Sequence, residues 1–156
     1  MSHEQFLQRA LRLAADHSEN GNNGPFGAVI VKDDQIISTG WNQVVEKHDP
    51  TAHAEIMAIR QACEKLETFN LRGCALYASC EPCPMCLSAI YWARLDIIYY
   101  AATRHDAASA GFDDEYFYQQ VCAAPQNRDI KCVHLPLSEA RNIFDVWQSN
   151  PQKKEY

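Results

Sequence analysis

The sequence predicts an α/β fold, a three-layer α-β-α sandwich in which helices cover both faces of a mixed five-stranded sheet. Its 156 residues have the length of one domain and can bury a core without disulfides. An apolar hairpin follows an opening helical segment, and the later strands alternate with helices. A hairpin is antiparallel and alternation favours parallel pairing, so we expect a mixed sheet covered on both faces.

The first elements are a helix and a hairpin. Ser2 and Gln5 form a capping-box pattern at the start of the helix. Apolar residues then recur at helical spacing: Phe6, Leu7, Ala10, Leu11, Leu13 and Ala14. After a loop rich in Asn and Gly, residues 26–32 and 35–42 form two apolar runs around a turn. Their composition predicts a hairpin buried on both faces.

Helices and strands alternate through the middle of the chain. A helix is predicted over residues 49–65, with Asp49 as its N-cap and Pro50 at the first helical position. The next predicted elements are a strand, a helix and a strand, over residues 74–79, 82–94 and 97–102.

The last third carries weaker patterns. Residues 113–121 are predicted to form a helix, residues 131–135 the fifth strand and residues 138–148 a final helix. We therefore expect a domain over residues 1–149 and a polar C-terminal tail over residues 150–156.

Composition excludes several classes of function. Twenty acidic residues against 14 basic ones give a net charge of −6. Affinity for nucleic acid depends largely on Lys and Arg that neutralise phosphates, so no nucleic-acid partner is expected. No apolar stretch approaches the roughly 18 residues of a membrane span, and no signal-peptide pattern is visible. Seven cysteines are an odd number, which favours reduced thiols and a cytoplasmic location.

Two short strings carry the chemistry, His53-Ala54-Glu55 and a C-x-x-C pair, Cys83 and Cys86, each at a predicted helix start. Two thiolates and an imidazole are good zinc ligands, and three protein ligands leave a fourth tetrahedral position for water. An ideal helix places Glu55 about 200° from His53, so the two converge only if His53 lies at or before the first turn. The carboxylate would then act as general base and afterwards as general acid.

The alternative is a structural zinc site without a catalytic water. Cys80 lies three residues before Cys83 and would complete a closed set of three thiolates and one imidazole. The chain would then be a binding module and Glu55 would have no chemical role. Against this alternative, Cys80 precedes Pro82 and is expected at the end of a strand.

An H-x-E string followed by P-C-x-x-C is characteristic of zinc-dependent nucleobase deaminases. On these residues the sequence resembles the cytidine deaminase-like superfamily, and more closely its small bacterial guanine deaminases. The resemblance covers nearly the whole chain. Its strings are GPFGAVIV at 24–31, DPTAHAE at 49–55, SCEPCPMC at 79–86, AIYWAR at 89–94, AGFDD at 110–114 and KKEY at 153–156. The strings at 110–114 and 153–156 are the ones that point toward guanine.

The resemblance implies that His53, Cys83 and Cys86 bind Zn²⁺ and that Glu55 moves protons. Hydroxide would attack C2 of guanine while Glu55 protonates the adjacent ring nitrogen. Loss of the amino group as ammonia would leave xanthine.

The resemblance also implies roles for residues around the base. Asn42 would hydrogen-bond it, Phe26 would stack on it, and Asp114 would contact its amidine edge and assist departure of the amine. The backbone amide of Ala54 would point into the site. Tyr156 would close the pocket as part of a lid. Without the resemblance, Asn42 is a turn residue, Phe26 a core residue and Asp114 a first-turn carboxylate.

Relatives of this kind are usually dimers, so the resemblance implies a homodimer. The tail, residues 150–156, would then close the pocket of its own subunit or, by C-terminal exchange, that of its partner. Alternative activities are deamination of guanosine, of cytidine, of guanine-like triazines or of adenosine in tRNA. The acidic charge of the chain disfavours tRNA.

Overall fold

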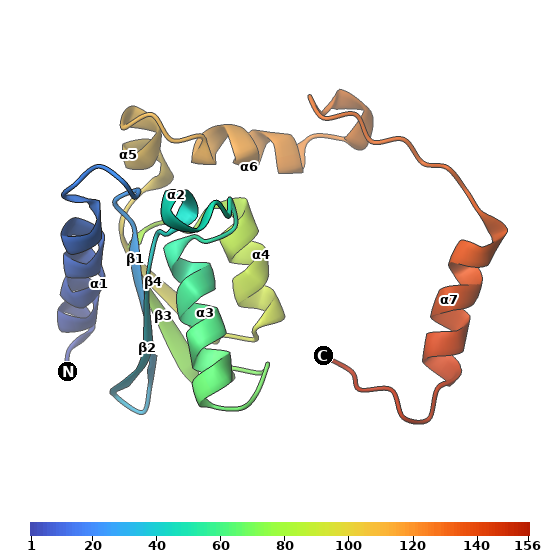
Figure 1. Cartoon of the computed structure of the whole chain (residues 1–156), viewed down its shortest axis with the longest axis horizontal. Coiled ribbons are helices and arrows are strands. Elements are labelled where there is room, and N and C mark those ends of the chain that lie inside the picture. Colours follow the sequence, from blue (N-terminus) through green and yellow to red (C-terminus); the bar gives the residue numbers. More distant parts are fainter.

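One mixed sheet of four strands forms the centre of the protein in this computed structural model, which describes all 156 residues (Figure 1). β1 (Gly27–Lys32) and β2 (Gln35–Trp41) form an antiparallel hairpin. β1 also pairs antiparallel with β3 (Cys74–Cys80), and β3 pairs in parallel with β4 (Ile97–Ala102). The strand order is therefore β2-β1-β3-β4.

The predicted hairpin is confirmed, and its turn explains its geometry. Asp33 and Asp34 have φ angles of 49° and 59°. Two central residues with positive φ are typical of the hairpin turns whose twist matches that of the strands. Burial on both faces was expected for both strands. It holds for β1, whereas β2 is only partly buried because it lies at the edge of the sheet.

The expected fifth strand is absent, so the prediction of five strands is wrong. Residues 131–135 have no regular secondary structure, and Val133 and Leu135 are 76% and 77% exposed. A strand needs a neighbouring edge to satisfy its backbone groups. The chain has left the sheet before it reaches these residues (Figure 1).

Helices cover both faces of the sheet, as predicted. α1 (His3–Ser18) packs on one face, and α3 (Ala54–Lys65) and α4 (Pro84–Trp92) lie on the other (Figure 1). Alternate strand residues point to opposite faces. The α1 side therefore has a core that includes Phe6, Val29, Val31 and Tyr77. The α3 side has a core that includes Ile30, Leu76, Ala58 and Ile90.

Gly40 brings the start of α3 directly onto β2. A Cβ atom added at Gly40 would lie 2.1 Å from the Ala54 carbonyl oxygen and 2.6 Å from the Ala58 nitrogen. No side chain fits between this strand and this helix. The first turn of α3 is therefore placed by backbone packing against the hairpin.

Two helices begin later than the sequence predicts. α3 begins at Ala54 rather than at Asp49. Asp49 accepts hydrogen bonds from both the backbone N–H and the hydroxyl of Thr51, at 2.8 and 2.6 Å, so it closes a local turn instead of capping the helix. α4 begins at Pro84 rather than at Pro82, because Cys83 keeps an extended backbone as N-cap.

Two short helices were not predicted, α2 (Val44–Lys47) and α5 (Arg104–Ser109). α5 follows directly from β4 and has a complete capping box between Thr103 and Asp106. The capping box predicted at Ser2 and Gln5 of α1 is confirmed.

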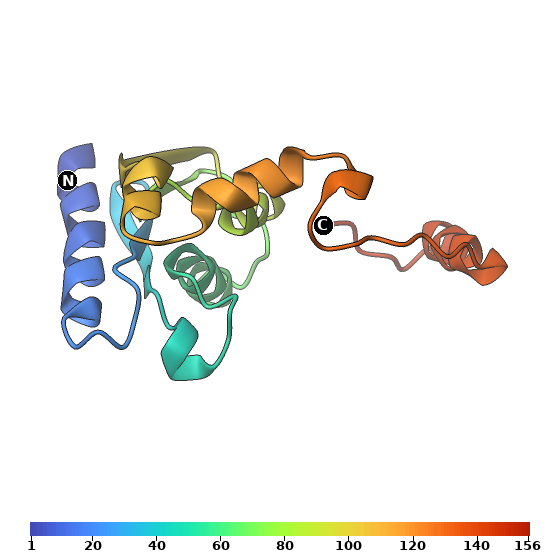
Figure 2. The same ribbon diagram turned by 90° about the horizontal axis from the view of Figure 1, so that it is seen from above.

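The chain divides into a body, residues 1–122, and an arm, residues 123–156, that extends away from it (Figure 2). α6 (Asp114–Cys122) ends the body, and α7 (Ser138–Ser149) lies on the arm, both close to their predicted limits. A 3₁₀ turn, η1 (Pro125–Asn127), lies between them. None of the helices is both long and apolar enough to cross a membrane.

Candidate metal centre

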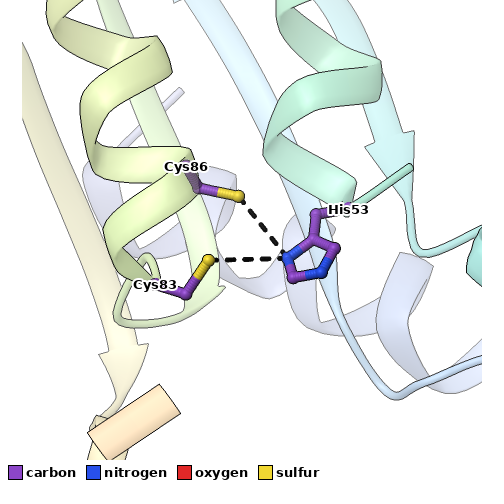
Figure 3. A group of neighbouring side chains, drawn as sticks. All are labelled: His53, Cys83 and Cys86. Carbon is purple, nitrogen blue, oxygen red and sulfur yellow. Dashed lines mark hydrogen bonds between the residues drawn. The ribbon is translucent and has the colours of Figure 1, made fainter. Parts of the chain in front are cut away.

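Three metal-ligating side chains converge from the N-termini of two helices (Figure 3). His53 is the N-cap of α3 and Cys83 is the N-cap of α4, each with an extended backbone. Cys86 lies in the first turn of α4. His53 Nδ1 is 3.6 Å from the Sγ atom of Cys83 and 3.6 Å from that of Cys86. All three ligand atoms lie within 4.8 Å of one another.

These distances fit zinc. With bonds of about 2.3 Å to sulfur and about 2.1 Å to nitrogen at a tetrahedral angle, the nitrogen and each sulfur should lie about 3.6 Å apart. Both nitrogen–sulfur distances are 3.6 Å. Two thiols and an imidazole are also the donor types that zinc prefers. The three residues predicted as ligands therefore form a group suited to Zn²⁺, with Nδ1 as the imidazole donor.

Cys80 does not join this group. It ends β3, as predicted, and its thiol donates to the Thr103 carbonyl oxygen at 3.4 Å. Burial raises the pKa of Cys80 to about 11, so it remains a neutral thiol. The geometry gives no support to the closed site with three thiolates.

The protonation of the ligand thiols is asymmetric when no cation is present. A hydrogen bond from Cys86, joined by one from His53, lowers the pKa of Cys83 to about 4. Donation to Cys83 and burial raise the pKa of Cys86, and the hydrogen bond to Cys83 raises the pKa of His53. The Cys83 thiolate accepts from two donors that carry protons, Cys86 and His53. A divalent cation that bound all three side chains would take the place of these protons.

Glu55 lies directly beside the ligands. It is the second residue of α3 and only 8% exposed, and its Oε2 accepts a hydrogen bond from the Cys86 thiol at 3.4 Å. The convergence with His53 is possible because His53 precedes the helix, as the sequence required. Burial raises the pKa of Glu55 to about 7, which suits a group that both takes up and releases protons near neutrality.

A cavity of about 240 Å³ opens onto this centre. His53, Cys83 and Glu55 form one part of its wall. Three further predicted site residues also line it, Phe26, Asn42 and Asp114. These residues come from the two ends of the hairpin, from the starts of α3 and α4 and from α6. The fold therefore brings together positions separated by up to 88 residues in sequence. The volume suits one small molecule.

The predicted base-contacting residues have structural roles as well. Asn42 is 7% exposed, and its Oδ1 accepts a hydrogen bond from the Val44 N–H at 3.2 Å, which is a turn contact. Phe26 packs edge-to-face on Phe112, with ring centroids 4.8 Å apart. Asp114 is half-buried at the start of α6, and burial raises the pKa of its carboxyl group.

Several lining residues were not assigned a role from sequence. Phe112 forms an aromatic pair with Phe26, and Glu81 accepts from the Arg104 N–H at 3.0 Å. Val44 and Val45 come from α2, a short helix that was not predicted. Phe112 could have been found, because it stands inside the AGFDD string that carries the resemblance.

The structure does not bring two predicted residues to the cavity wall. Ala54 is buried as the first residue of α3, and its amide role stays a prediction. Tyr156 lies against Phe69 and Trp92 of its own chain, with ring centroids 6.5 and 5.7 Å away, and its carbonyl oxygen accepts from the Arg94 guanidinium. The tail of this chain therefore does not close its own cavity.

A second cavity, of about 500 Å³, reaches the same ligands from another side. It shares His53 and Cys83 with the first cavity. Apolar side chains of α6, Phe117 and Val121, form part of its wall. The metal centre is therefore open to two hollows.

Comparison with known proteins agrees with the geometry. Residues 1–102 match the family described as the cytidine and deoxycytidylate deaminase zinc-binding region. The chain is 51% identical to guanine deaminase of Bacillus subtilis over 156 residues, which is all of both chains. The solved structure of that enzyme superposes with a TM-score of 0.96 and covers 100% of this chain and 99% of its own.

More distant relatives include one enzyme named for tRNA and another named for guanine. A tRNA-specific adenosine deaminase of Aquifex aeolicus is 39% identical over 147 residues, 92% of each chain. A structure of guanine deaminase from Nitrosomonas europaea has a TM-score of 0.65 at 33% identity, and covers 70% of this chain and 63% of its own. The expected resemblance is confirmed, and this chain belongs to the zinc-binding cytidine and deoxycytidylate deaminase family.

Proposed function

We propose that this protein is a guanine deaminase that hydrolyses guanine to xanthine and ammonia. The observation that carries the proposal is Asp114, which lies on α6 beyond the region matched by the family and still lines the cavity beside the metal ligands. A carboxylate there can accept hydrogen bonds from the N–H groups of the guanine amidine edge. The full-length likeness to the Bacillus subtilis enzyme supports the same substrate.

His53, Cys83 and Cys86 would hold the zinc ion. Zinc bound by three side chains supplies a water whose pKa is lowered to about 7. This chemistry needs a proton acceptor close to the metal ligands. Glu55 is the buried carboxylate that the fold places there, at 3.4 Å from the Cys86 thiol.

The side chains divide the remaining work. Glu55 takes one proton of the water that adds to C2 and delivers it to the adjacent ring nitrogen. The second proton of that water then passes from the new C2 hydroxyl group, by way of Glu55, to the amino nitrogen. The bond from C2 to the amino nitrogen breaks, the oxygen becomes the C2 carbonyl of xanthine, and ammonia leaves. Asp114 holds the amidine edge and Asn42 the opposite polar edge. Phe26, braced by Phe112, offers a face on which the flat ring can stack.

Ammonia release tests this proposal directly. The purified zinc-loaded protein is incubated with guanine, guanosine, adenosine and cytidine. Release from guanine alone is expected. Release from guanosine or cytidine but not from guanine would show that the proposed substrate is wrong. If none of the four compounds released ammonia while zinc was bound, a structural zinc module would be favoured.

A tRNA adenosine deaminase is the second candidate, because the tRNA-specific adenosine deaminase of Aquifex aeolicus is 39% identical to this chain over 147 residues. The net charge of −6 opposes it, since a polyanionic substrate requires a basic surface. Inosine formation in a tRNA substrate, measured beside guanine deamination, separates the two.

We further propose that the protein acts as a homodimer whose arms are exchanged. On α7 the large apolar side chains are exposed to between 46% and 71%, namely Ile143, Phe144, Val146 and Trp147. An amphipathic helix gains its stability by burying such a face. The body of a second copy is the partner that would cover this face, because the extended arm carries α7 away from its own body (Figure 2).

In the exchanged dimer, the deaminase domain of residues 1–149 would receive the tail of residues 150–156 from its partner. The wide second cavity beside His53 and Cys83 leaves room for such a lid. Mixing Glu55→Gln with a chain shortened by residues 150–156 tests this arrangement. Activity in the mixture well above that of either variant alone is expected, since one of the two sites would combine an intact Glu55 with an intact tail. No recovery in proven mixed dimers would exclude a lid from the partner.

We also propose a cytoplasmic location. All seven cysteines are free thiols in the structure, which fits a reducing compartment.

A further inference from the structure

α6 carries Asp114 into the site, yet it is only loosely fixed to the body. The helix has no fully buried residue. Its contacts with neighbouring elements are the packing against α4 and α5 and a few polar bonds. One of these bonds is made to the turn before α4: the Tyr118 hydroxyl donates to the Pro82 carbonyl oxygen at 2.7 Å.

This hydrogen bond joins two parts of the site that are distant in sequence. Asp114 and Tyr118 are four residues apart on α6, so their side chains share a face of the helix. Pro82 stands immediately before Cys83, a metal ligand. The bond therefore ties the face of α6 that bears Asp114 to the turn that bears Cys83.

A second contact fixes the tyrosine ring. The Arg104 guanidinium lies over the Tyr118 ring, 4.5 Å from its centroid. The backbone N–H of Arg104 donates to Glu81, which precedes Pro82 and lines the cavity. The ring is thus braced by α5 while its hydroxyl points at the turn.

We propose that Tyr118 is a positioning residue that sets the distance between Asp114 and the metal centre. This inference rests on the proposed function of Asp114 in guanine binding. The hydroxyl matters for catalysis through its bond to Pro82, whereas the ring matters for the packing of α6. A tyrosine needed only to pack α6 would require the ring and not the hydroxyl group.

The test is a double-mutant cycle with Tyr118→Phe and Asp114→Asn. Tyr118→Phe keeps the ring and the contact with Arg104 and removes only the hydroxyl. Loss of one hydrogen bond should lower kcat/KM for guanine about two- to tenfold, with zinc content unchanged and the melting temperature lowered by no more than a few degrees. In the Asp114→Asn background the same change should have less than about a twofold effect, since the group that it positions is already removed.

Tyr116→Phe is the matched control. It removes a hydroxyl from the same helix, and that hydroxyl is bonded to Asp129 of the arm rather than to the metal strings. Its kcat/KM should equal that of the wild type. An unchanged rate in Tyr118→Phe, an additive effect in the Asp114→Asn background, an equal effect in Tyr116→Phe or loss of zinc would each overturn the proposal. If wild-type protein released no ammonia from guanine, the proposed function itself would fail instead.

Discussion

The metal centre and the arm differ in how far their side chains are buried. At the centre, Cys83, Cys86 and Glu55 are buried and hydrogen-bonded to one another or to His53. On the arm, Phe144 and Trp147 are 71% and 46% exposed. The first region is formed within one chain, whereas the apolar face of α7 is not covered by its own chain. Folding of the body and assembly of the protein should therefore respond to different mutations.

The largest effect is expected from the centre. Glu55→Gln keeps the shape of the side chain but removes the proton acceptor, so kcat for guanine should fall about 100-fold to 10,000-fold. Metal analysis should show zinc retained, and circular dichroism should show the fold intact. A fall in zinc content that matches the fall in rate would assign Glu55 to metal binding rather than to proton transfer.

The next largest effect is expected at Gly40, where β2 packs directly on the first turn of α3. In Gly40→Ala the added methyl group meets the Ala54 carbonyl, which leaves no room for it. Overpacking of this kind costs about 1–3 kcal/mol of unfolding free energy, or more. Urea unfolding should report this loss, and zinc affinity should fall with it because α3 carries His53. Gly21→Ala is the control for a surface glycine, although its φ of 72° adds local strain without touching α3.

The arm should respond in assembly and not in folding of the body. Phe144→Ser combined with Trp147→Ser is expected to weaken the proposed dimer by at least about 100-fold, since apolar anchors dominate interfaces. Analytical ultracentrifugation measures the dissociation constant, and zinc per chain should stay the same. Equal sedimentation of variant and wild type over a dilution series would remove α7 from the interface.

The smallest effect is expected at a helix cap in the body. The Thr103 hydroxyl accepts from the Asp106 N–H and completes the capping box of α5. Thr103→Ala should lower the unfolding free energy by about 1 kcal/mol. The dimer should be unaffected, which is the reverse of the result expected for the arm. A change in dimer affinity would show that α5 is part of the interface.

Much of the body could be predicted from sequence because its signals are local. The capping box at Ser2, the hairpin and the grouping of His53, Cys83 and Cys86 all follow from short patterns whose chemistry is self-contained. The same holds for Glu55, whose place was conditional on His53 lying outside the helix. That condition is met, since His53 is the N-cap of α3.

The errors concern features that depend on a neighbour. Residues 131–135 have the composition of a strand, but a strand forms only beside a free edge of a sheet. Composition does not reveal that these residues lie on the arm, away from any such edge. Asp49-Pro50 has the pattern of a helix start, but the Asp49 carboxylate bonds Thr51 instead. Phe112 gains its role only from Phe26, which lies 86 residues earlier.

The two N-caps have a consequence for the evolution of the protein. Helices usually begin with Ser, Thr, Asp or Asn, whose side chains bond the free N–H groups of the first turn. At α3 and α4 these positions hold His53 and Cys83, and neither side chain makes a capping bond. Each helix therefore forgoes about 1 kcal/mol of its own stability. Substitution of ordinary capping residues at these two positions would stabilise the protein but would remove two of the side chains proposed to bind zinc. Selection for stability and selection for turnover therefore favour different residues at positions 53 and 83.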